Sequence, residues 1–171
     1  MDLLDRLLGH DEWTTGKCLR RCGELTPEQM RRRHDLGWGS VQATLMHMIG
    51  NVRVWTELMR DGDSPTARTD DPILDVDGLE RLHRASYAEF SAFARSIRDA
   101  GRMDERWVDT LDDPPREKSF GGAILHVVTH DMHHRSEVLH MLGRLGLSNL
   151  PEGDLPGWEQ TVSTGQEVPT R

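Results

Sequence analysis

The sequence predicts an all-α protein in which four long helices form a bundle. Helix-forming residues dominate the chain of 171 residues, and runs of β-branched residues are absent. Apolar residues recur at intervals of three and four in four long segments, which is the pattern of amphipathic helices. Two of the connections between these segments are long enough to act as crossovers, an arrangement found in many four-helix bundles.

The first half of the chain contains two long helices and one short helix. The first long helix is expected at residues 2–24, where a 3–4 spacing of Leu and Cys residues ends near Gly23. A short helix should follow from Thr26, because a Thr cap, Pro at the first position and Gln at the third are typical of a helix start. The second long helix is expected from Ser40, a good N-cap, to about Arg60.

The second half begins with residues 61–76, which are rich in Asp, Thr and Pro and predict a connecting loop. The third long helix is expected at about 77–100. Residues 102–118 form a second long connection, with room for a short extended pair, and the fourth long helix should run from near Ser119 to about Gly143. We place the bundle domain at residues 1–146. The Pro- and Gly-rich residues 147–171 are expected to form a C-terminal tail that is extended or partly disordered.

Composition excludes several classes of protein. The net charge of −8 argues against a nucleic-acid-binding surface. No apolar run approaches the ~20 residues that a helix needs to span a bilayer. The N-terminal residues lack the basic region of a signal peptide. We therefore expect a cytoplasmic protein with no membrane or nucleic-acid partner.

The two cysteines, Cys18 and Cys22, are one helical turn apart. The favoured interpretation is that both are small apolar side chains facing the core, because free cysteine is usually buried. A redox pair or a soft-metal site is the alternative. Their spacing is not the CxxC of thioredoxin-like sites.

Histidines are concentrated in the fourth helix. Five of the nine histidines lie in the stretch Leu125–His140. His126, His130 and His134 form a ladder at one-turn spacing, and two histidines in that relation can share one metal ion. By helical angle, His130 and His134 lie beside the apolar sector, whereas His126 lies further round. The expected apolar sector consists of Leu125, Val127, Val128, Met132, Val138, Leu139, Leu142 and Leu145.

A further histidine lies in the second long helix. His47 and Asn51 align with the rim of the buried face, and a buried histidine needs a polar partner. That partner is either a hydrogen-bonding group in the core or a metal ion. Together with the ladder, a metal ion is the favoured partner. We therefore predict that His47, His130 and His134 bind one divalent ion.

Three protein ligands would leave coordination positions open, as in catalytic rather than structural sites. Zn is the expected metal, and Ni, Fe or Mn are alternatives, because imidazole does not select strongly among such ions. Glu137, His133 and Asn51 are candidate catalytic residues that support the ligands or handle protons. A zinc protease of the HExxH type is disfavoured, because Asp131 replaces the glutamate of that motif.

The chain resembles the DinB/YfiT-like family over roughly residues 3–145. The resemblance rests on Trp13, on His47 followed by Trp55, and on the segment from His130 to Arg135. It implies a four-helix bundle with a three-histidine metal site, whose ligands fall on His47, His130 and His134. It also implies a homodimer. The chain departs from the family pattern at Ser136-Glu137, where Gly-Gln is frequent, and at Asn51, where an acidic residue is frequent.

Relatives with this fold include transferases and isomerases that use low-molecular-weight thiols such as bacillithiol or mycothiol. The resemblance therefore implies a metal-dependent thiol S-transferase that acts on an electrophilic small molecule, with the thiol as cosubstrate. A metal-dependent hydrolase on the same site is one alternative. A non-catalytic metal-binding protein of the stress response is the other.

Overall fold

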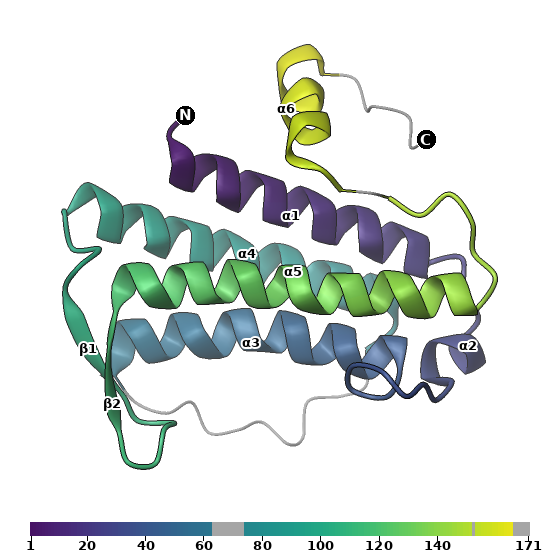
Figure 1. Ribbon diagram of the computed structural model, residues 1–171, viewed down its shortest axis with the longest axis horizontal. Coiled ribbons are helices and arrows are strands. Elements are labelled where there is room, and N and C mark those ends of the chain that lie inside the picture. The colour runs from purple at the N-terminus through teal and green to yellow at the C-terminus, as the bar shows by residue number, and fades with distance from the viewer. Residues whose placement is uncertain (63–73, 152, 166–171) are drawn as a thin grey trace. The chain divides into compact units, whose positions relative to one another are not determined.

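The computed structural model describes residues 1–62, 74–151 and 153–165, and these residues are mainly helical (Figure 1). The all-α prediction is confirmed. The described elements are α1 (Leu3–Cys22), α2 (Pro27–Arg31), α3 (Val41–Asp61), α4 (Val76–Asp99), β1 (Arg106–Asp109), β2 (Arg116–Ser119), α5 (Phe120–Arg144) and α6 (Leu155–Thr164). The four long helices predicted from the sequence correspond to α1, α3, α4 and α5. Most of the connecting loop expected at 61–76 lies outside the described residues.

The chain divides into two compact units, Met1–Leu45 with Asp131–Arg171, and Met46–His130. Helix α5 contributes residues to both. None of the helices in the described ranges is both long enough and apolar enough to cross a membrane.

In the first unit, local capping explains where the helices begin. The side chain of Asp2 accepts a hydrogen bond from the Asp5 backbone N–H at 2.9 Å and caps α1. The predicted start of α2 is confirmed as a capping box. The Thr26 hydroxyl accepts from the Gln29 backbone at 3.2 Å, and the Gln29 side chain accepts from the Thr26 backbone at 2.9 Å.

The expectation of an irregular tail is wrong for Leu155–Thr164, which forms α6. Asp154 caps this helix, and Gly165, with a φ of 67°, ends it in the left-handed conformation. Trp158 is 5% exposed and packs on α1 at Gly9, where an added Cβ would lie 2.5 Å from the indole ring. The Pro and Gly residues that suggested disorder thus act as helix boundaries, and one tryptophan anchors the helix.

The second unit contains α4 and a two-stranded hairpin. The core side of α4 carries Leu79, Tyr87, Phe90, Ala94 and Ile97, all at most 2% exposed. The extended pair considered for residues 102–118 is present, because β1 and β2 pair antiparallel. Lys118 of β2 forms ion pairs with the buried Asp109 and with Asp112, and its ammonium lies 4.9 Å from the centre of the Trp55 ring. The hairpin is therefore fixed beside α3.

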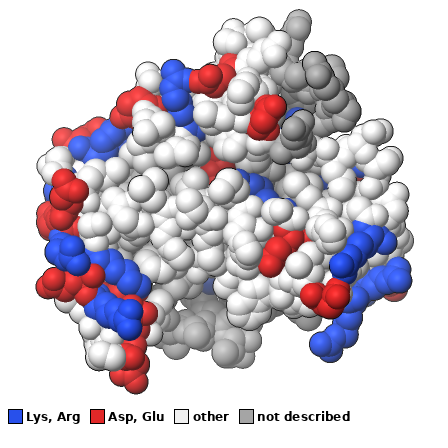
Figure 2. All heavy atoms as spheres, viewed as in Figure 1, with Lys and Arg blue, Asp and Glu red and all other residues white. Residues whose placement is uncertain are grey.

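The exposed side of α5 differs from the prediction at Leu125 and Met132, which are 49% and 57% exposed. The angular analysis placed both in the apolar sector. The buried arc is instead turned toward Asp131 and Arg135, which are 1% and 6% exposed. Because two charged residues occupy core positions, two apolar residues are displaced to the surface. In the space-filling view, the area over the middle of α5 is accordingly mainly uncharged (Figure 2).

Both cysteine thiols are free and buried in α1, at 1% and 0% exposure. A hydrogen bond with Cys18, burial and the proximity of the Cys18 charge all raise the pKa of the Cys22 thiol. This supports the interpretation as core side chains, because thiol reactivity requires an accessible thiolate.

We therefore expect neither thiol of Cys18 or Cys22 to react with Ellman's reagent at pH 8 while the protein is folded. Protein unfolded in guanidinium should release two equivalents of the coloured thiolate, one for each cysteine. Rapid reaction of the folded protein would show that the pair is accessible and would restore the redox interpretation.

Candidate metal centre

Two of the predicted ligands lie side by side within the second unit. His47 of α3 and His130 of α5 are both partly buried, and their Nε2 atoms are 3.2 Å apart. Their ring centres are 5.1 Å apart. Two nitrogen ligands bound to one zinc at about 2.0–2.1 Å in tetrahedral geometry would be separated by about 3.3–3.4 Å. The separation of the two Nε2 atoms thus suits a shared ion.

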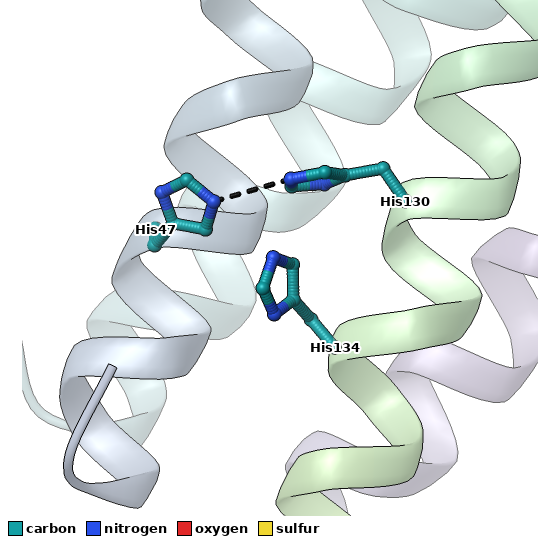
Figure 3. A group of neighbouring side chains, drawn as sticks. All are labelled: His47, His130 and His134. Atoms are coloured by element: carbon teal, nitrogen blue, oxygen red, sulfur yellow. Dashed lines mark hydrogen bonds between the residues drawn. The ribbon is translucent and has the colours of Figure 1, made fainter. Parts of the chain in front are cut away.

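The third predicted ligand follows one turn later on the same helix. His134 has a side chain that is 10% exposed. One ligand nitrogen from each of His47, His130 and His134 lies within 4.8 Å of the other two. The three rings point toward a common space (Figure 3). Because imidazole is a strong ligand for Zn and similar ions, this donor set fits a divalent transition metal.

Asn51, one turn after His47 on α3, contacts the other side of the His130 ring. Its amide nitrogen lies 3.2 Å from Nδ1 of His130. A metal on Nε2 requires the proton on Nδ1, and that N–H then needs an acceptor. The amide oxygen of Asn51 supplies one after a half-turn of the amide, whose two ends have nearly the same shape. Asn51 is therefore positioned to orient His130.

Glu137 orients His134 in the same way, through Nδ1 of the ring. One carboxylate oxygen, Oε2, is 2.7 Å from Nδ1 of His134, while the other, Oε1, is 3.3 Å from Nε2 of His133. A carboxylate on Nδ1 keeps the proton there and leaves Nε2 with its lone pair for a metal. The arrangement of His134 and Glu137 is thus that of a carboxylate supporting a metal-binding histidine.

The loop before α3 approaches the Glu137 side chain closely. Gly37 has a φ of 55°, and an added Cβ would lie 3.0 Å from Oε2 of Glu137 and 2.7 Å from Oγ1 of Thr44. The next residue, Trp38, donates its backbone N–H to the same Thr44 hydroxyl at 3.0 Å. Only glycine fits both the backbone conformation and this close approach. The loop therefore limits the positions that the Glu137 side chain can take.

The remaining histidines of the ladder region lie elsewhere. The ring of His126 lies 4.7 Å from that of Trp55, and burial, with a smaller effect of Lys118, lowers its pKa. His133 is exposed and contacts His134 edge to face, with ring centres 5.1 Å apart. His140 is also exposed.

Sequence reasoning missed a buried charged cluster on the other side of α5. The Arg135 guanidinium donates from Nη1 to the Asp11 carboxylate and, at 3.0 Å, to the Thr15 hydroxyl. Burial raises the pKa of Asp131 well above its usual range, the charge of Asp11 adds to this, and Arg135 opposes it. Asp131 thus belongs to this cluster. The signal in the sequence was an acidic residue on the core side of α1, which a polarity pattern alone assigns to the surface.

Substitution of any of the three ligands by alanine should abolish tight binding of one divalent ion per chain. For His47, His130 and His134 the loss in zinc affinity, measured by chelator competition, should exceed the 10–100-fold typical of residues that only support ligands. The circular dichroism spectrum should stay helical.

His140→Ala is the matched control, because that residue is exposed on the same helix. His83 is less suitable, because it is 6% exposed and packs on Tyr87 with ring centres 5.4 Å apart. Equal zinc affinity in the His140 and His134 variants would contradict the assignment.

Loss of the buried Arg135 guanidinium should reduce the stability of the fold. Arg135→Ala leaves Asp11 buried without its counter-ion, and breaking a buried ion pair typically reduces the free energy of unfolding by about 3–5 kcal/mol. Arg144→Ala removes an exposed pair with Asp35 and should have no measurable effect in urea denaturation. Equal stability of the two variants would show that the cluster does not fix α5.

Comparison with known proteins agrees with this architecture. No curated protein sequence gives a significant match. Among solved structures, the fold is similar to that of a DinB-like protein, YjoA, from Bacillus subtilis, with a TM-score of 0.64 and 12% sequence identity over 88% of this chain and 96% of that chain. The sequence model of the DinB family matches residues 1–159. The chain therefore belongs to the DinB family.

Proposed function

We propose that the protein is a metal-dependent S-transferase that joins a low-molecular-weight thiol to an electrophilic small molecule. The observation that carries the proposal is the convergence of His47, His130 and His134, whose ligand nitrogens lie within 4.8 Å of one another. Zn is the metal we favour, with Ni, Fe or Mn as alternatives. A divalent ion held there would lower the pKa of a thiol or of water and so supply a nucleophile near neutral pH.

The chain's own residues contribute orientation and proton transfer. Glu137 holds the Nδ1 proton of His134, and the Asn51 amide oxygen, once turned toward Nδ1, would hold that of His130. Both Nε2 atoms would then be free to bind. Oε1 of Glu137 is directed at Nε2 of His133, whose side chain is 68% exposed. A proton on Glu137 can therefore pass to His133 and then to solvent. In this scheme Glu137 and His133 handle protons, whereas Asn51 is a positioning residue.

Membership of the DinB family supports this proposal. The sequence resemblance implies thiol-dependent transferases among proteins of this fold, and bacillithiol or mycothiol would be the class of cosubstrate. The net charge of −8 disfavours nucleic acid as a substrate. We expect a homodimer in the cytoplasm.

The direct test is product analysis. Protein loaded with zinc, nickel, iron or manganese is incubated with a bacillithiol-type thiol and an activated aryl halide, an epoxide or an unsaturated carbonyl compound. We expect a thiol adduct in the mass spectrum, lost in His47→Ala and retained in His140→Ala. A water adduct alone would favour the hydrolase. Absence of any turnover in metal-loaded protein would favour a non-catalytic metal-binding protein of the stress response.

A further inference from the structure

We propose that His133, His134 and Glu137 form a second, outer metal-binding position that shares His134 with the three-histidine site. This outer position would bind a divalent ion such as Zn, Ni or Cu. The proposal rests on the metal-binding part of the proposed function, through His134, but not on thiol chemistry.

The donor atoms of this outer position are close together and chemically suitable. One ligand atom from each residue lies within 4.8 Å of the other two. Oε2 of Glu137 is 2.7 Å from Nδ1 of His134, and Oε1 is 3.3 Å from Nε2 of His133. Two imidazole nitrogens and a carboxylate form the donor set of many zinc sites. All three residues lie on α5, and Glu137 follows His133 by four residues and His134 by three, so its carboxylate can reach both rings.

Exposure decreases from the outer donor inward. The side chains of His133, Glu137 and His134 are 68%, 16% and 10% exposed. An ion arriving from solvent therefore meets His133 first. Glu137 lies close to Gly37, where an added Cβ would be 3.0 Å from Oε2, and its side chain is only 16% exposed.

The two positions compete for one imidazole. A neutral histidine has a lone pair on only one of its two ring nitrogens. Binding at the three-histidine site uses Nε2 of His134 and keeps the proton on Nδ1, where it donates to Glu137. Binding at the outer position uses Nδ1 and places the proton on Nε2. Since both cannot occur with a neutral ring, the wild-type chain should hold one ion tightly, and the outer position should appear when the inner one is removed.

The experiment starts from the double variant His47→Ala/His130→Ala, which removes two inner ligands and leaves the outer group intact. Zinc affinity and stoichiometry are measured by equilibrium dialysis with zinc chloride, and folding is checked by thermal melting. We expect one ion per chain, bound more weakly than in wild type. Adding His133→Ala should weaken this residual binding at least tenfold, whereas adding His140→Ala should leave it unchanged. His133→Ala alone should retain tight binding.

Equal zinc affinity with and without the His133 substitution in the double-variant background would overturn the proposal. So would the absence of residual zinc binding in that folded background. If the background does not fold, His47→Asn/His130→Asn keeps polar side chains at both positions and is judged by the same criteria. Failure of thiol transfer in wild type with this binding pattern intact would reject the proposed function and leave the outer position standing.

Discussion

The rotation of α5 about its own axis is the constraint on which the candidate site depends. His134 and Arg135 are neighbours in sequence, yet one is directed toward the histidine group and the other toward Asp11 of α1. A buried guanidinium and a buried carboxylate cannot be separated without a large loss of stability. The ion pair therefore fixes the angle of the helix, and with it the direction of His130 and His134. The same helix thus carries both the buried cation and two of the candidate ligands.

The hydrogen-bonding partners of the rings matter as much as the rings themselves. Without a defined proton position, each imidazole could present either a lone pair or an N–H to the common space. Asn51 faces Nδ1 of His130, and Glu137 faces Nδ1 of His134. The two partners differ, because a carboxylate always accepts whereas an amide can accept or donate. The proton position of His134 is therefore more strongly fixed than that of His130. Glu137, the partner of His134, is also a ligand of the proposed outer position.

Much of the fold could be predicted because its signals are local. The capping box at Thr26, the N-cap at Ser40 and the histidine ladder each depend on residues within one or two turns. The proximity of His47 to His130 could be anticipated because a polar residue on the rim of a buried helix face needs a partner. The structure brings these two residues together, as expected.

The features that could not be predicted depend on distant partners. Asp11, Asp131 and Arg135 look like surface residues until their mutual contact is known, and their burial moves Leu125 and Met132 to the outside. Likewise, Asp154 and Gly165 mark the ends of α6 in the sequence, but the packing of Trp158 on α1 depends on a distant partner. At 12% identity, the similarity to YjoA shows a shared fold.

The central claim is that three imidazoles hold one ion, and X-ray absorption at the zinc edge tests it most directly. With less than one equivalent of zinc per chain, the spectrum should show three histidine nitrogens at about 2.0–2.1 Å, with the multiple scattering typical of imidazole rings. His47→Ala should reduce the number of histidine ligands. A sulfur ligand in the wild-type spectrum would contradict the account. So would a His47→Ala spectrum identical to that of the wild type.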